Sequence, residues 1–192
     1  DSLSMDPVIV PEDSGTPIGW YRKRFTLPAD YSDKLVYLEF EGIFRDSEIY
    51  VNGTFIGRHM SGYTGMRFEI SDVLYFDGRE NVVAVRVDCT QNEGWFYEGA
   101  GIYRNAFLDV RERVSIAPDS VFVKSIPVFD NDKAISAQID VSCEIVNETD
   151  IDRTVSVSFS TEEQTFTTEI VVPSFGKADA NGKLRVNNPR VW

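Results

Sequence analysis

Apolar and polar residues alternate along most of the chain with a period of two, the pattern of half-buried β-strands. The segment 35–43, LVYLEFEGI, sets Val36, Leu38 and Phe40 against a second face that carries Glu39 and Glu41. The segment 80–89, ENVVAVRVDC, is so continuously apolar that it predicts a largely buried strand. Asn52-Gly53, inside SEIYVNGTFIGRH, is typical of a tight hairpin turn between two short strands.

Helix signals are nearly absent, and the strongest is a single short turn within 71–76. From residue 114 onward, strand-like segments recur at regular intervals between turn residues, which is typical of an immunoglobulin-like sandwich. Composition changes at the same place, since residues 1–113 hold 18 of the 24 aromatic side chains. The sequence therefore predicts an all-β protein with two domains, 1–113 and 114–192.

The charge and the chemistry-bearing residues narrow the function. A formal net charge of -12 disfavours nucleic acid and anionic membranes as partners. Cys89 and Cys143 fit no metal-ligand spacing and are interpreted as two unpaired, small apolar residues. The single histidine, His59, cannot form a histidine-rich metal site, and a structural hydrogen bond is expected for it. The residues imply no cofactor, no metal and no membrane span.

The stretch EGWFYEGAGIYRNAFL, residues 93–108, holds the candidate ligand-binding residues, Glu93, Trp95, Tyr97 and Glu98. In a functional interpretation, the two aromatic rings offer flat apolar faces to a sugar. The two carboxylates then accept charge-assisted hydrogen bonds from its hydroxyls. In a structural interpretation, the aromatic residues fill the core at a glycine-rich corner. Alternation favours a mixed outcome, in which Phe96 and Tyr103 are buried while Trp95 and Tyr97 point outward.

Four stretches in this order and spacing carry a family resemblance: GWYRKRFTLP, VYLEFEGIFRDSEIYVNGTFIGRHMSGYTGMRFEIS, RENVVAVRVD and EGWFYEGAGIYRNAFL. Together they resemble the N-terminal sugar-binding domain of glycoside hydrolase family 2, which contains β-galactosidases, β-glucuronidases and β-mannosidases. The final LRVNNPRVW resembles the end of that family's next, immunoglobulin-like domain. The resemblance implies a jelly-roll β-sandwich at 1–113 and an immunoglobulin-like β-sandwich at 114–192, truncated at its C-terminal end.

The resemblance also implies a function. In that family both catalytic glutamates lie in a downstream TIM barrel, so this chain is expected to hold no catalytic residue and to be inactive alone. Its expected role is to support the barrel and complete the pocket for a β-linked sugar, within a β-galactosidase-like enzyme. The loop 93–98 is implied as the contributing segment, and Glu93 as the nearest match to an acidic residue of that loop. A homo-oligomeric parent and a periplasmic or secreted location are further expectations.

Two other classes stay open at this point. The chain is alternatively a self-sufficient carbohydrate-binding module, or a structural, adhesin-like pair of sandwiches. A following barrel in the parent protein would remove the last of these.

Overall fold

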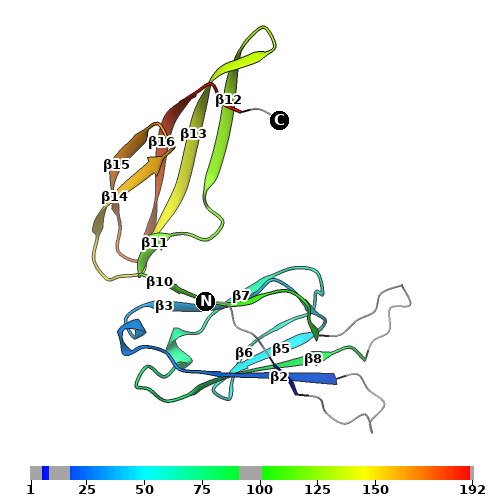
Figure 1. Cartoon of the computed structure of the whole chain (residues 1–192). Helices are drawn as coiled ribbons and strands as arrows, with labels where there is room; N and C mark the ends of the chain where they lie inside the picture. The colour runs from blue at the N-terminus through cyan, green and yellow to red at the C-terminus, as the bar shows by residue number, and fades with distance from the viewer. Residues whose placement is uncertain (1–5, 9–17, 91–100, 191–192) are drawn as a thin grey trace. The chain divides into compact units, whose positions relative to one another are not determined.

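The computed structural model describes residues 6–8, 18–90 and 101–190. The chain divides into two compact units, Asp1–Glu112 and Arg113–Trp192 (Figure 1). Within the described residues both units consist of strands, and the helical structure is limited to two short 3-10 turns, η1 (Ala29–Tyr31) and η2 (Ser71–Val73). The prediction of an all-β sandwich protein is confirmed.

The first unit pairs its strands antiparallel in two main sheets and one small ribbon. The larger sheet has the order β1 (Asp6–Val8), β2 (Ile18–Phe25), β8 (Asn81–Asp88), β5 (Ser47–Val51) and β6 (Thr54–His59). The smaller sheet has the order β10 (Ala106–Arg111), β3 (Leu35–Phe40) and β7 (Met66–Glu69). The ribbon joins β4 (Ile43–Phe44) to β9 (Gly101–Ile102).

The core of the first unit lies between the two main sheets, which face one another in Figure 1. Alternate residues of β3, β5 and β8 are fully buried there, among them Val36, Leu38, Phe40, Ile49 and Val83. The turn between β5 and β6 has positive φ at both Asn52 (51°) and Gly53 (83°), as a tight hairpin turn with right-handed strand twist requires. The hairpin prediction is confirmed.

The second unit has a sheet in which β13 (Lys133–Asn147) lies between β16 (Gly176–Asn187) on one edge and β11 (Val114–Ile116) and β12 (Phe122–Asp130) on the other. A separate two-stranded sheet pairs β14 (Arg153–Ser160) with β15 (Thr165–Val172). The core is small and centres on Cys143, Ile145, Val157, Val172 and Ala180. All nine residues of β12 are exposed.

Candidate functional site

The four predicted ligand-binding residues, Glu93, Trp95, Tyr97 and Glu98, lie outside the described residues, as does Phe96. The structure does describe the chain on both sides of this segment. One side is the end of β8, and the other is β9 with the residues after it. These two flanks, and the side chains around them, form the candidate site.

Hydrogen bonds fix the end of β8 to the neighbouring β4–β5 connection. The backbone N–H of Asp88 donates to the carbonyl of Asp46 at 3.1 Å, and the Cys89 thiol donates to the carbonyl of Phe44 at 3.4 Å. The Asp88 carboxylate accepts from the Thr90 N–H at 3.0 Å and from Arg86 at 2.8 Å. Hydrogen bonds from Thr90, followed by the contribution of Arg86, lower the pKa of Asp88, so this carboxylate is held ionised. Burial raises the pKa of the Cys89 thiol, which opposes thiolate chemistry there.

The other flank, β9, begins with a glycine whose backbone conformation and surroundings exclude a larger residue. Gly101 has φ of 118°, a conformation that residues with a Cβ rarely adopt, and the Tyr21 hydroxyl occupies the place where a Cβ would project. Gly101 pairs with Phe44, and Ile102 pairs with Ile43 and packs on the core. The segment after β9 is thereby fixed to the same β4 strand that anchors Cys89.

Tyr103 is exposed over 51% of its surface, so the prediction that it is buried is wrong. Ile102 takes the position that contacts the core, and the next side chain leaves the interior. The Tyr103 hydroxyl donates to the carbonyl of Gly62 at 2.8 Å, and the edge of its ring lies against Gly42. The ring is consequently held in place at the surface, with part of it accessible to a ligand.

A polar hollow opens beside this ring, and sequence reasoning did not find it. It is lined by Glu39, Glu41, Gly65, Tyr103, Arg104 and Asn105. The Asn105 amide donates to Glu41 at 2.9 Å, Arg67 donates to Glu39, and the Arg104 guanidinium lies 5.5 Å from the centre of the Tyr103 ring. The hollow combines hydrogen-bond acceptors, hydrogen-bond donors and an aromatic ring, and a ligand with hydroxyl groups could bind to such a combination. Glu39 and Glu41 are far from residues 103–105 in the sequence, so the spacing of these residues along the chain does not indicate that they line one hollow.

Three further observations concern the metal-ligating side chains, the helices and the single histidine in the described part of the chain. No group of three or more His, Cys, Asp or Glu residues gathers there in a geometry that suits a metal ion. No described helix has the length and apolar character that a membrane crossing requires. His59 shares a hydrogen bond with the Thr64 hydroxyl at 2.9 Å.

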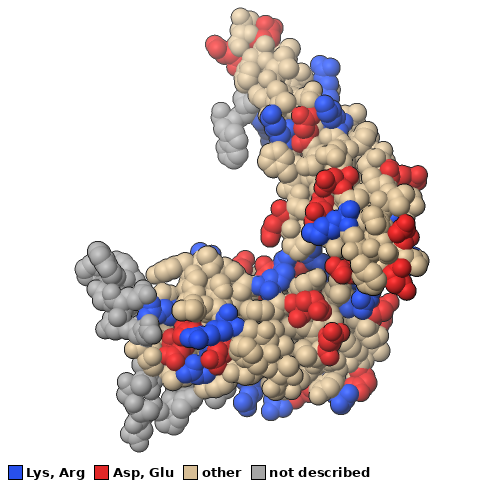
Figure 2. Space-filling model, turned by 180° about the vertical axis from the view of Figure 1, so that it is seen from behind, with Lys and Arg blue, Asp and Glu red and all other residues tan. Residues whose placement is uncertain are grey.

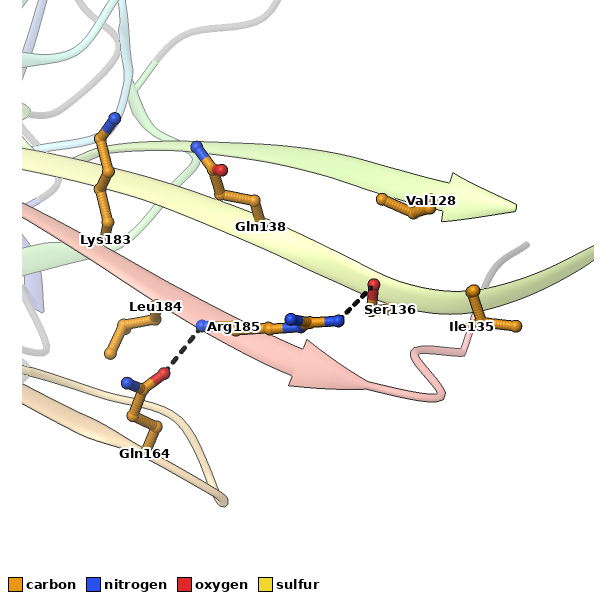
Figure 3. Close-up of a pocket in the computed structure, with 8 residues that line it drawn as sticks. All are labelled: Val128, Ile135, Ser136, Gln138, Gln164, Lys183, Leu184 and Arg185. Atoms are coloured by element: carbon orange, nitrogen blue, oxygen red, sulfur yellow. Dashed lines mark hydrogen bonds between the residues drawn. The ribbon is translucent and has the colours of Figure 1, made fainter. Parts of the chain in front are cut away.

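The second unit has a pocket of about 440 Å³ lined by residues of β12, β13 and β16 and by Gln164 of the β14–β15 turn (Figure 3). Val128, Ile135 and Leu184 supply apolar surface. The Arg185 backbone N–H donates to Gln164 at 2.8 Å, and the Arg185 guanidinium donates to Ser136 at 3.5 Å (Figure 3). The lining has no carboxylate, imidazole or thiol, and its potentially reactive groups are the Ser136 hydroxyl and the Lys183 amine. No carboxylate or imidazole lines the pocket to activate the Ser136 hydroxyl as a nucleophile.

Comparison with known proteins supplies the family. The model of the family described as glycosyl hydrolases family 2, sugar binding domain, matches residues 2–111. The chain therefore belongs to glycoside hydrolase family 2.

Relatives of known function cover both units. A β-galactosidase of Bacteroides ovatus is 30% identical over 183 residues, which is 91% of this chain and 21% of that protein. A β-glucuronidase of Formosa agariphila is 28% identical over 206 aligned residues, 90% of this chain and 20% of that protein. The crystal structure of a family 2 member from Bacteroides cellulosilyticus superposes with a TM-score of 0.77 at 28% identity, covering 91% of this chain and 24% of the other. The chain thus spans about a fifth of the length of the curated relatives it matches.

Proposed function

We propose that these 192 residues are the non-catalytic N-terminal part of a family 2 exo-β-glycosidase, in which they support the catalytic domain and complete its sugar pocket. The family match over residues 2–111, in a chain that spans only a fifth of its relatives, carries this proposal. In the same proposal the first unit is a jelly roll and the second is immunoglobulin-like. The parent enzyme is then a retaining glycosidase whose two reacting carboxyl groups lie in a further, TIM-barrel domain of the same polypeptide.

The surface of the second unit supports a protein partner. Val123, Ile126, Val128 and Phe129 on β12 are 57%, 40%, 50% and 53% exposed. Exposed apolar strands at a sheet edge are uncommon in isolated proteins, because they favour association with other chains. We take the partner to be further polypeptide of the same enzyme, because the Asn188 N–H donates to the carbonyl of Ile135 and so holds the chain after β16 beside the β12–β13 hairpin.

The sugar contact is proposed for the segment 93–98 together with the polar hollow beside Tyr103. The described residues on either side of the segment are attached to β4, since Cys89 donates to Phe44 and Gly101 pairs with Phe44. The hollow includes Tyr103, two residues after Gly101, and this closeness in the chain supports a shared contact with one sugar. The substrate we propose is a β-galactoside, and relatives named β-glucuronidase make a β-glucuronoside the alternative. A self-sufficient carbohydrate-binding module remains the second candidate function, and the same hollow is its support.

Activity assays test the proposal directly. The 192-residue chain should not hydrolyse nitrophenyl β-galactoside or nitrophenyl β-glucuronide, because the paired carboxyl groups of a retaining glycosidase are assigned to another domain. The full-length enzyme should hydrolyse one of them, and Glu93→Gln or Trp95→Ala in it should raise KM more than they lower kcat. Turnover by the 192-residue chain that disappears in the double variant Glu93→Gln, Glu98→Gln would overturn the proposal.

A further inference from the structure

The outer face of the larger sheet in the first unit carries a row of aromatic side chains. Strand alternation turns Tyr21, Ile49 and Val85 toward the core. Their neighbours Trp20 and Tyr50 therefore point to the opposite face, where Phe55 of β6 pairs with Tyr50 across the hairpin. We refer to Trp20, Tyr50 and Phe55 as the outer aromatic row.

The three rings are in contact although their strands are not all neighbours. Trp20 on β2 and Tyr50 on β5 are separated by β8, where Ala84 is the residue opposite Tyr50. Because Ala84 carries only a methyl group, the two rings approach across β8 to a centroid distance of 6.1 Å. Tyr50 then meets Phe55 edge to face at 5.5 Å. Phe55 is 55% exposed, so the row ends in an accessible apolar ring.

Paired charges border the row on one side. Arg86 lies opposite both Trp20 and Glu48 in the sheet, donates to Asp88 at 2.8 Å and lies 3.8 Å from Glu48. The Tyr50 hydroxyl donates to Glu48 at 2.8 Å, which fixes the ring. The side chains of Arg86 and Glu48 are 24% and 27% exposed, so they reach solvent while their geometry is held.

The charge pattern distinguishes among ligand classes. Arg86 is balanced by Glu48 and Asp88, and Arg58 is balanced by Asp46 at 2.6 Å. Figure 2 shows that Lys and Arg are intermixed with Asp and Glu over the side of the molecule that it displays. Arg22 of β2, opposite Ala84, adds one exposed arginine to this face. Because Arg86 and Arg58 are paired with carboxylates, the face offers a polyanion no cluster of uncompensated positive charge. A neutral ligand with both apolar and hydroxyl surface fits the chemistry.

We propose that the outer aromatic row, bordered by Glu48 and Arg86, binds a neutral oligosaccharide of β-linked pyranoses. This binding is independent of the segment 93–98, which we call the pocket loop. Equatorially linked pyranoses present flat C–H faces, and these pack against the negative faces of aromatic rings. Carboxylate and guanidinium groups at the border accept from and donate to adjacent hydroxyls. Such a surface would hold a glycan chain while another part of the enzyme hydrolyses it. This inference does not require the proposed function to be correct.

The test is a titration of the ¹⁵N-labelled 192-residue chain with cellotetraose and with β-1,4-linked mannotetraose, followed by amide chemical shifts. We expect saturable shifts on β2, β8, β5 and β6 with at least one of the two probes. Phe55→Ala and Trp20→Ala should each weaken binding about tenfold or more, as expected for removal of a central aromatic contact. Glu48→Gln keeps the shape of the site and should weaken binding by a smaller factor.

Two controls separate this surface from other aromatic residues. Phe129→Ala removes a 53% exposed ring from the second unit and should leave the affinity unchanged. Trp95→Ala alters the pocket loop and should also leave it unchanged. The proposal is overturned by an absence of saturable binding at millimolar probe, by shifts confined to other strands, or by a loss that follows Trp95→Ala and not Phe55→Ala. Because Phe55 is exposed, its replacement should preserve folding, which the unligated spectrum verifies.

Discussion

The two units differ in how completely their sheets cover one another. In the first, a three-stranded sheet lies against a five-stranded one, and Val83 on β8 is fully buried. In the second, the smaller sheet has only two strands, and Val123 on β12 is 57% exposed. Both valines belong to regular strands and pair with a neighbour. The burial of a strand residue is therefore decided by what lies opposite its sheet, and the strand itself does not guarantee it.

The largest expected difference between the units comes from one phenylalanine in each. Phe40→Ala removes a fully buried side chain from the first core and should lower that unit's free energy of unfolding by about 3–5 kcal/mol. Phe129→Ala removes a 53% exposed ring and should change the second unit by about 0.5 kcal/mol or less. Hydrogen exchange in a urea series, read by peptide mass, reports each unit separately. Equal losses would show that the exposed strand contributes as much as the core does.

Replacing one buried asparagine in each unit should destabilise the two units by more similar amounts than replacing the two phenylalanines does. The Asn147 amide donates to the carbonyls of Ile151, Val172 and Pro173, and its oxygen accepts from Thr149. Asn147→Ala leaves these buried groups without their partner and should destabilise the second unit by about 2 kcal/mol. The same exchange measurement tests this value.

Asn81→Ala provides the matched variant in the first unit. Asn81 is also fully buried and hydrogen-bonds both backbone groups of Tyr75 and the amide of Asn52. A similar loss of about 2 kcal/mol is expected there. A loss in one unit only would mean that water replaces the amide at the other site.

The sequence predicts the strands well because their signals are local. Alternation in 35–43 and the Asn52-Gly53 turn are properties of adjacent residues, and both are observed. The exposure of β12 could not be predicted in this way. Its sequence, FVKSIPVFD, is as apolar as that of a covered strand, and only the number of strands in the opposing sheet leaves it uncovered.

The candidate site shows the same limit. The hollow beside Tyr103 joins Glu39 and Glu41 to residues 103–105, more than 60 positions away, through the pairing of β3 with β10. The outer aromatic row depends likewise on Ala84, whose small size lets rings on β2 and β5 meet. Neither arrangement follows from the spacing of residues along the chain. The loop residues Glu93, Trp95, Tyr97 and Glu98 stay predictions.

A charge on β12 tests whether its apolar surface serves association. Val123→Lys should change the free energy of unfolding by about 0.5 kcal/mol or less, because the side chain is already in solvent. It should also reduce self-association of the 192-residue chain, measured by sedimentation velocity, since a lysine on an exposed edge strand opposes strand pairing.

Val141→Lys is the matched control. Val141 is the ladder partner of Val123 but only 9% exposed, and a charge there should unfold the unit. Equal self-association of the Val123→Lys chain and the wild-type chain would show that β12 is not a surface through which copies of this chain associate.

The smallest expected effect is a pH dependence that belongs to the first unit. Hydrogen bonds from Arg58 at 2.6 and 2.7 Å lower the pKa of Asp46. A carboxyl group whose pKa is lower in the folded than in the unfolded state adds stability above its unfolded pKa, about 3.9, and this stability is lost as the pH falls toward the folded pKa. Asp46→Asn should therefore cost a small amount at pH 7 and progressively less as the pH falls below about 3.9, so that the first unit loses stability less steeply in acid. Exchange profiles at pH 7, 4 and 3 measure this slope, with the second unit as an internal reference. A variant whose slope equals that of the wild type would show that Arg58 is satisfied as well by solvent as by Asp46.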